Sequence, residues 1–164
     1  MIVKFATWNV NSLRVRLPQV IDWLENNPVD VLCLQELKLP QDKFPLEALE
    51  EIGYQAQWAG QPTYNGVALI SKTTGTDVQR NIPGFEDHQQ RIVAATYDSP
   101  KGPLRVISAY CPNGQDLESD KYVYKMNWFA ALHEWLQDEL SRYPNLMILG
   151  DYNVAPTDLD VHDP

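Results

Sequence analysis

The stretch Leu146-Met147-Ile148-Leu149-Gly150-Asp151-Tyr152-Asn153 decides how the whole chain is interpreted. Its run of apolar residues predicts a short buried strand, and the glycine then permits a sharp turn of the backbone. An acid and an amide follow at once, at the position where open α/β sheets place their ligands. The same residues are also typical of a strand end closed by an Asx turn. The choice between these interpretations depends on whether other strands end in the same way.

Several other segments have the composition of strands. They are rich in β-branched and apolar residues and are bounded by turn residues. They comprise residues 2–8, 29–34, 54–58, 66–71, 92–97 and 104–109. The segment between residues 71 and 92, which is rich in Gly, Thr and Asp, is expected to be a loop. Residues 98–103 are expected to form a hairpin-like connection between the last two strands of this set.

Helices are expected between these strands. The first begins at Pro18, because proline is favoured at the first helical position, and ends at Asn26-Asn27-Pro28. A short helix begins near Pro45 and is capped by Gly53. The longest runs from about Asp120 to Tyr143, with Ser119 or Asp120 as its N-cap. Its apolar face comprises Phe129, Leu132, Leu136, Leu140 and Tyr143, and is widened by Trp128 and Trp135.

Length, composition and charge limit the class of protein. A chain of 164 residues with 44% hydrophobic and 21% charged residues corresponds to one globular domain. Its apolar runs are too short for a transmembrane helix, and its start lacks the features of a signal peptide. Cys33 and Cys111 are expected to be buried and unpaired in a reducing compartment, which predicts a cytoplasmic location. A net charge of -9 argues against a general basic face for nucleic acid, but it is compatible with a metal-dependent nuclease.

Other strands do end in polar residues of the same kind. The strand ends are Trp8-Asn9-Val10-Asn11, Gln35-Glu36-Leu37-Lys38, Tyr110-Cys111-Pro112-Asn113-Gly114 and Gly150-Asp151-Tyr152-Asn153. If they meet at one edge, carboxylates, amides and a phenol gather in one site. Such oxygen ligands suit Mg²⁺, with Mn²⁺ as the alternative, and no His/Cys set suggests zinc. The pattern therefore predicts metal-assisted hydrolysis of a phosphate ester.

Each of these side chains has an expected role. Glu36 is expected to bind the metal directly, with Asn9 holding the ion or its waters. Asp151 is expected to activate the attacking water while Asn153 fixes its geometry, and both also belong to the expected metal-binding set. The expected hydrogen-bond donors to the phosphoryl oxygens are Tyr110 and Asn113.

These motifs resemble the exonuclease III family of apurinic/apyrimidinic (AP) endonucleases, within the endonuclease/exonuclease/phosphatase superfamily. The matching segments, in the family's order, are Thr7-Trp8-Asn9-Val10-Asn11-Ser12-Leu13-Arg14, Leu34-Gln35-Glu36, Tyr64-Asn65-Gly66-Val67-Ala68, Tyr110-Cys111-Pro112-Asn113-Gly114 and Gly150-Asp151-Tyr152-Asn153. The resemblance implies a four-layer α/β sandwich, in which two mixed sheets lie face to face with helices outside. It also implies Mg²⁺-dependent cleavage of DNA 5′ to abasic sites, with related 3′-to-5′ exonuclease and 3′-phosphatase activities.

The resemblance also implies roles for individual residues. Glu36 and Asn9 match metal-binding positions, and Tyr110, Asp151 and Asn153 match active-site positions. Contacts with DNA are implied for Asn113, Arg91, Tyr64 and Asn65; the last three are equally compatible with ordinary surface or loop positions. The implied partner is double-stranded DNA with abasic sites or damaged 3′ ends, bound by a monomer.

The chain departs from the family pattern in two respects. Leu37 stands where the family commonly has threonine, and we expect only a local packing effect. Family members continue with further strands, an aspartate and an Asp-His pair, so residues 1–164 are expected to form a single domain that is truncated before its last strands. The isolated chain is therefore expected to show little or no cleavage of abasic sites. His162-Asp163 follows Asn153 too closely to be that pair, and all three histidines are expected at the surface, at positions 88, 133 and 162.

Two alternatives stay open. Other branches of the superfamily act on lipid head groups or small nucleotides and share the Asn, Glu and Gly-Asp-x-Asn signals, although segments 64–68 and 110–114 favour the DNA-repair branch. A non-catalytic binding module is the second alternative, against which the intact polar strand ends argue. The sequence leaves undecided the balance between endonuclease and exonuclease activity and the number of metal ions.

Overall fold

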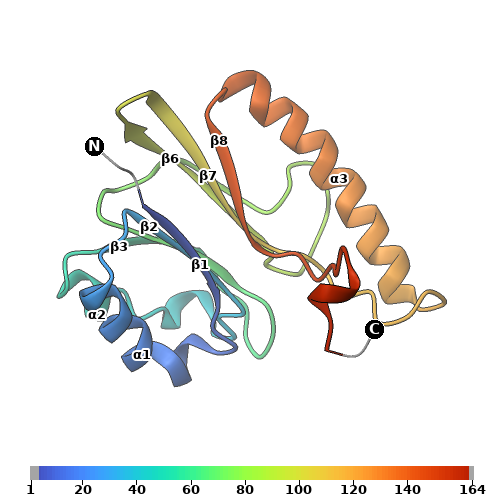
Figure 1. Cartoon of the computed structure of the whole chain (residues 1–164), viewed down its shortest axis with the longest axis horizontal. Coiled ribbons are helices and arrows are strands. Elements are labelled where there is room, and N and C mark those ends of the chain that lie inside the picture. The colour runs from blue at the N-terminus through green and yellow to red at the C-terminus, as the bar shows by residue number, and fades with distance from the viewer. Residues whose placement is uncertain (1–3, 163–164) are drawn as a thin grey trace.

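The computed structural model describes residues 4–162 and contains two four-stranded sheets packed face to face, with helices on both outer sides (Figure 1). The first sheet has the order β1-β2-β4-β3, and the second has the order β5-β6-β7-β8. The pairs β1–β2 and β7–β8 are parallel, while the other neighbours are antiparallel. The fold is therefore the four-layer α/β sandwich that the resemblance implies, and this prediction is confirmed.

The strands lie close to the expected segments. In the first sheet they are β1 (Phe5–Asn9), β2 (Val31–Gln35), β3 (Gln55–Ala59) and β4 (Val67–Ser71). In the second sheet they are β5 (Thr76–Arg80), β6 (Ile92–Ser99), β7 (Gly102–Tyr110) and β8 (Leu146–Asp151). Residues 2 and 3 of the first expected strand lie outside the described residues.

Helices bury one face of each sheet, and the sheets bury each other's inner faces. Helices α1 (Leu13–Asn26) and α2 (Leu46–Glu50) cover the first sheet, and α3 (Asp120–Arg142) covers the second. Two short 3₁₀ turns, η1 (Gln41–Lys43) and η2 (Asp158–Asp160), complete the elements. Because side chains alternate along a strand, each strand contributes to both an outer and an inner layer. The inner layer includes Val31, Cys33, Leu69, Val93 and Val106.

Several smaller expectations are also confirmed. Ser119 is the N-cap of α3, where its hydroxyl accepts a hydrogen bond from the Tyr122 amide. Cys33 and Cys111 are buried and unpaired. Leu37 is fully buried in the core beneath α1, while its expected local effect stays a prediction. The three histidines, at positions 88, 133 and 162, are exposed, whereas Asp163 lies outside the described residues.

Two elements differ from the sequence prediction. The segment expected to be a loop contains β5, an edge strand whose polar residues pair with β6 on one side and bulge between Thr76 and Gln79. Helix α1 begins at Leu13, so the expected start at Pro18 is wrong. Proline removes one backbone hydrogen bond there, but the burial of Val20 and Leu24 beneath the helix offsets that loss.

The final strand and helix also require correction. Gly150 does not turn the chain: it lies within β8, where a Cβ would sit 1.8 Å from the Ala109 carbonyl oxygen. Strand β8 is an edge strand and only half-buried, not the buried strand that its composition predicts. On α3, Trp128 and Trp135 are central to the buried face, while Leu140 is 50% exposed.

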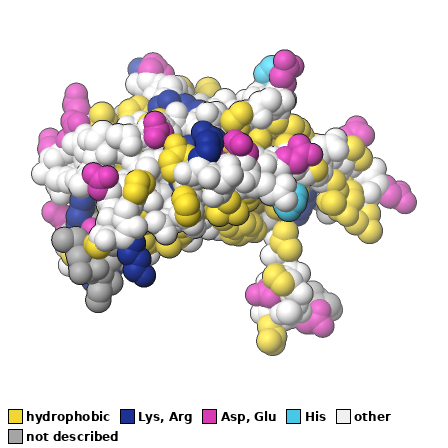
Figure 2. All heavy atoms as spheres, turned by 90° about the horizontal axis from the view of Figure 1, so that it is seen from above, with side chains coloured by type: hydrophobic (Ala, Val, Ile, Leu, Met, Phe, Trp, Pro, Cys, Tyr) yellow, Lys and Arg dark blue, Asp and Glu magenta, His cyan; other side chains and the backbone are white. Residues whose placement is uncertain are grey.

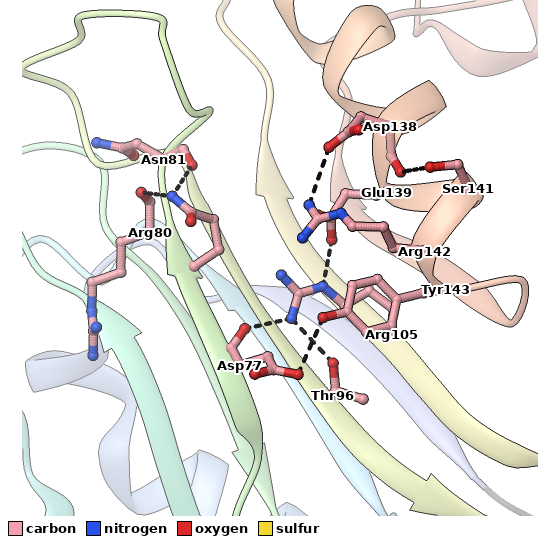
Figure 3. A network of polar contacts seen from close by, with 11 residues as sticks. Asp77, Arg80, Asn81, Thr96, Arg105, Asp138, Glu139, Ser141, Arg142 and Tyr143 are labelled. Carbon is pink, nitrogen blue, oxygen red and sulfur yellow. Dashed lines mark hydrogen bonds and ion pairs between the residues drawn. The ribbon is translucent and has the colours of Figure 1, made fainter.

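A buried charge network holds the C-terminal part of α3 against the second sheet (Figure 3). The Nε of Arg105, on β7, donates to Glu139 Oε2 at 2.5 Å, and both side chains are almost completely buried. The Nη1 of Arg105 donates to the Asp77 carbonyl oxygen, and its guanidinium lies 4.8 Å from the centre of the Tyr143 ring. Arg142 pairs with the same glutamate from the solvent side. Glu139 is thus buried because arginines neutralise its charge.

Candidate active site

Three predicted site residues project from the inner faces of the two sheets at the same end of the sandwich. Phe5, Tyr110 and Leu149 all pack in the layer between the sheets. Because side chains alternate with a period of two, Asn9 on β1 and Asp151 on β8 face this layer as well. Edge strands β1 and β8, with β7 beside β8, therefore bring these residues together across the layer between the sheets.

Asp151 is held from both sheets. Its Oδ2 accepts a hydrogen bond from Asn9 Nδ2 at 2.9 Å, although the two residues are 142 positions apart. Its Oδ1 accepts from the Asn153 amide at 3.0 Å. The side chain of Asn153 donates in turn to the Cys111 carbonyl oxygen at 2.9 Å. The carboxylate is thus fixed in orientation by amides rather than neutralised by a cation.

The hydrogen bond from Asn153 to Asp151 is an Asx turn. Asn9 and Asn113 make the same local bond, to the amides of Asn11 and Gln115 respectively, both at 3.0 Å. The two interpretations of these strand ends are therefore compatible. The turn uses one oxygen of Asp151 and leaves the other to join the two sheets.

Glu36 enters the site through an unusual backbone conformation. It follows β2 with a φ of 57°, in the left-handed region that residues other than glycine rarely adopt. Simple alternation would send its side chain toward the helices, because Gln35 faces the inner layer. The amide of Ser12 donates to the Glu36 carbonyl at 2.8 Å and supports this turn. Lys38 Nζ lies 3.6 Å from Glu36 Oε1, at a partly exposed ion pair.

Tyr110 lies between this carboxylate and an arginine. Burial raises the pKa of Tyr110 to about 12, assisted by the negative charge of Glu36 and a hydrogen bond to that carboxylate, while Arg91 opposes the shift. The phenol is therefore neutral at physiological pH and remains a hydrogen-bond donor. The guanidinium carbon of Arg91 lies 4.9 Å from the centre of the Tyr110 ring.

Arg91 is buried and ordered by protein contacts. Its Nη1 donates to the Tyr110 carbonyl oxygen at 3.1 Å, while Nε and Nη2 donate to Gln89 Oε1 at 3.0 and 2.6 Å. It forms one wall of a pocket of about 360 Å³ next to the site. The pocket is lined by Gln61, Tyr64, Asn65, Gln89, Arg91, Tyr110, Pro112, Asn113, Lys121 and Tyr124. All four residues expected to contact DNA thus border one pocket.

A second cavity of about 440 Å³ opens on the other side of Asp151. It lies at the edges of β1 and β8 and is lined by Thr7, Trp8, Asn9, Gln35, Gly150, Asp151, Tyr152, Asn153 and Val154. Tyr152 and Val154 are 39% and 55% exposed on this side. The carboxylate of Asp151 is therefore accessible from the edge of the sandwich.

The donor set fits a hard divalent cation. Glu36 provides a partly exposed carboxylate, and its charge and that of Asp151 both act on the Tyr110 phenol. Asn9 contacts Asp151 directly. Within residues 4–162, no cluster of three or more His, Cys, Asp or Glu side chains forms a metal cage. Magnesium is usually held by one or two carboxylates with several waters, whereas a structural zinc site needs four protein ligands. The residues present therefore suit Mg²⁺ or Mn²⁺ better than zinc.

Three lysines that the sequence did not indicate as site residues also lie in this region. Lys38 pairs with Glu36 and donates to Asn11 Oδ1 at 2.5 Å. Lys125 Nζ donates to the Asn153 carbonyl oxygen at 2.6 Å, and Lys121 borders the pocket beside Arg91. The spacing of Lys121 and Lys125, four residues apart at the start of the long predicted helix, is the signal that could have identified them.

Acidic side chains outnumber basic ones in the chain as a whole. Figure 2 shows acidic side chains scattered over one face, with few basic ones among them. This distribution agrees with the net charge of -9. The cations near the strand ends are thus a local feature, as expected for a phosphate-binding enzyme with this net charge.

In the described part of the chain, no helix is sufficiently long and apolar to cross a membrane.

Comparisons with known proteins agree with this geometry. The model of the endonuclease/exonuclease/phosphatase family matches residues 6–164. The exodeoxyribonuclease III of Haemophilus influenzae is 35% identical over 161 residues, which cover 97% of this chain and 60% of that protein. The chain thus spans about three-fifths of the length of this relative.

Solved structures of nucleases and phosphatases that act on DNA share the fold of this chain. The 3′ phosphatase NExo from Neisseria, bound to a product DNA hairpin, superposes with a TM-score of 0.94 at 51% identity, covering 99% of this chain and 62% of that one. An AP endonuclease from Archaeoglobus fulgidus superposes with a TM-score of 0.89 at 37% identity, covering 98% and 61%. The family model thus matches nearly the whole of this chain, and the relatives agree with it in sequence and in structure. The chain belongs to the endonuclease/exonuclease/phosphatase family, on its exonuclease III branch.

Proposed function

We propose that the full-length protein is a Mg²⁺-dependent DNA-repair nuclease that hydrolyses the phosphodiester 5′ to abasic sites and processes damaged 3′ ends. The observation that carries this proposal is the cross-sheet contact between Asn9 and Asp151, beside Glu36 and Tyr110. It gathers oriented acceptors, a neutral phenol donor and a carboxylate for a cation at one edge. Residues 1–164 would contribute these groups as part of a single domain.

In this proposal the residues divide the work between them. Asp151 accepts a proton from the attacking water, and Asn9 and Asn153 keep its carboxylate in one orientation. Tyr110 donates a hydrogen bond to the phosphoryl group as negative charge develops there, and Asn113, which borders the same pocket, does the same. Glu36, with Asn9, Asp151 and Asn153 nearby, would hold Mg²⁺ or Mn²⁺, which supplies positive charge to the phosphate and the leaving oxygen.

The pocket bordered by Tyr64, Asn65 and Arg91 is the proposed contact with the DNA backbone. Arg91 and Lys121 give it a positive charge in an otherwise acidic protein, and Asn65 and Asn113 add amides. Tyr64 is 66% exposed and is available to a ligand outside the pocket. We expect a monomer in the cytoplasm to bind duplex DNA through this edge.

The relatives support both activities in the proposal. The Neisseria structures at 51% identity are described as a 3′ phosphatase and a 3′-5′ exonuclease, whereas the Archaeoglobus structure is an AP endonuclease. The full-length protein is therefore proposed to act on abasic sites and on 3′ ends, and their ratio is the quantity to measure.

One set of assays tests the proposal. The full-length protein is incubated with an abasic-site duplex, an undamaged duplex, a duplex ending in a 3′-phosphate and a phosphoinositide, each with Mg²⁺ or EDTA. We expect the abasic or 3′-phosphate duplex to be cleaved with Mg²⁺ alone, and residues 1–164 by themselves to show little or no cleavage. Cleavage of the phosphoinositide without cleavage of either damaged duplex would overturn the proposal, and robust nicking by residues 1–164 would contradict the expected dependence on the rest of the protein.

A further inference from the structure

A buried polar cluster joins the two sheets within a layer that is otherwise mainly apolar. Gln35 of β2 is 1% exposed and Ser108 of β7 is fully buried. The Ser108 hydroxyl donates to the Leu34 carbonyl oxygen at 3.1 Å and accepts from Gln35 Nε2 at 3.2 Å. Gln35 Nε2 also donates to the Thr7 hydroxyl of β1, at 3.0 Å. The cluster therefore links β1, β2 and β7 by directed bonds.

The cluster lies directly beneath the candidate active site. Gln35 immediately precedes Glu36 in the chain. Thr7 and Ser108 stand two residues before Asn9 and Tyr110, on the same faces of their strands because side chains alternate. Each member of the cluster thus shares a strand, or a strand end, with one group of the site. A shift of one sheet against the other would move Glu36 relative to Tyr110.

Stability alone is a weak reason for polar groups at this depth. An amide and a hydroxyl lose their hydration on burial, and their mutual hydrogen bonds return little net free energy. Apolar residues of similar shape would fill the space at comparable stability, but apolar contacts are not directional. Hydrogen bonds fix distance and angle, and reacting groups lose activity when they are displaced by about 1 Å.

We propose that Gln35 and Ser108 are positioning residues, which set the two sheets in the register that aligns Glu36 with Tyr110 and Asp151. Ser108 is fully buried and Gln35 is only 1% exposed where it borders the cavity beside Asp151, so both act through the strand ends that follow them. The catalytic part of this inference rests on the proposed function, whereas the alignment of the site does not.

The test uses the full-length protein with Gln35→Leu and Ser108→Ala, separately and together. Cation binding is followed by the Mn²⁺-induced broadening of the side-chain amide resonances of Asn9, and activity by kcat and KM on an abasic-site duplex. We expect Mn²⁺ affinity and kcat to fall by about 10- to 100-fold in the double variant, with KM changed much less. Thr7→Val should also lower Mn²⁺ affinity and kcat, while Thr7→Ser, which keeps the hydroxyl, should leave both close to the wild-type values.

Ser71→Ala is the matched control. Ser71 is 1% exposed on β4, and its hydroxyl donates to the Thr73 carbonyl at 2.7 Å, at the opposite end of the sandwich from the site. This control should lower the unfolding midpoint as Ser108→Ala does, but leave Mn²⁺ affinity and kcat unchanged. Equal losses of Mn²⁺ affinity and kcat in Ser71→Ala and Ser108→Ala, or unchanged Mn²⁺ affinity in the double variant, would overturn the positioning role. If the wild type cleaves no DNA, the proposed function fails, while a selective loss of Mn²⁺ affinity still supports the positioning role.

Discussion

Arg105 and Asp151 are each held by side chains from distant parts of the chain, but their surroundings differ in charge. Arg105 meets Glu139 at 2.5 Å in a buried network that Arg142 completes (Figure 3). Asp151 accepts hydrogen bonds from the neutral side-chain amide of Asn9 and the backbone amide of Asn153, and it borders an open cavity. One region neutralises its charges internally, whereas the other orients a carboxylate and leaves its charge available.

The difference separates a structural function from a chemical one. A buried ion pair strongly destabilises the fold when one partner is removed, because the other is left charged and dry. A carboxylate at an accessible edge adds little to stability but can accept a proton or a cation. Substitutions in the two regions should therefore affect different measurements.

The largest effect is expected at Asp151. Asp151→Asn in the full-length protein keeps the shape and one of the two acceptor oxygens but removes the proton acceptor, so kcat on an abasic-site duplex should fall by about 10²- to 10⁴-fold. The free energy of unfolding should change little. Asp98→Asn, an exposed acid at the other end of β6, is the control and should leave both quantities unchanged. An active Asp151→Asn enzyme would remove the distinction between the regions.

The converse result is expected at Glu139. Glu139→Ala leaves Arg105 buried without its partner and should reduce the free energy of unfolding by about 3–5 kcal/mol, as measured by urea denaturation. At temperatures where the variant is folded, kcat should match the wild type. Glu134→Ala, an exposed acid on the same helix, should change stability by less than about 0.5 kcal/mol. Comparable stability of the two variants would mean that the network contributes nothing.

The two regions also differ in how much of their structure can be predicted from the sequence. Strand ends and the 3.6-residue period located most elements, because polarity and turn residues are local signals. The edge strand β5 was missed because Asp77, Gln79 and Arg80 give it the composition of a loop. Burial of Glu139 could not be predicted from its own helix, since its partner Arg105 is 34 residues away, on strand β7.

The candidate site shows the same division. The positions of Asn9, Tyr110 and Asp151 at strand ends were readable, and the structure brings them together. Their mutual contacts depend on topology, as the bond between Asn9 and Asp151 across 142 residues illustrates. The left-handed conformation of Glu36, which turns its side chain into the site, has no sequence signal comparable to a glycine.

The smallest effect concerns the ionisation of Tyr110. Its pKa of about 12 in the folded protein lies above the ordinary value of 10.0, so the folded state binds more protons between these pH values. The stability from the neutral phenol is complete below pH 10 and is lost as the pH rises toward 12. Spectroscopic titration of tyrosinate should show one fewer high-pH ionisation in Tyr110→Phe, and Glu36→Gln should lower the pKa of Tyr110. An unchanged pKa in Glu36→Gln would show that the phenol does not sense this carboxylate.

The most direct test of the central claim is where a divalent cation binds to the full-length protein. As Mn²⁺ is added, the side-chain amide resonances of Asn9 and Asn153 should broaden before those elsewhere, and Mg²⁺ should reverse the effect. In Glu36→Gln the same broadening should require at least about 10-fold more Mn²⁺. Broadening that begins around the exposed acids of α3, Glu134 and Asp138, or that is identical in Glu36→Gln, would contradict a cation site at this edge of the sandwich.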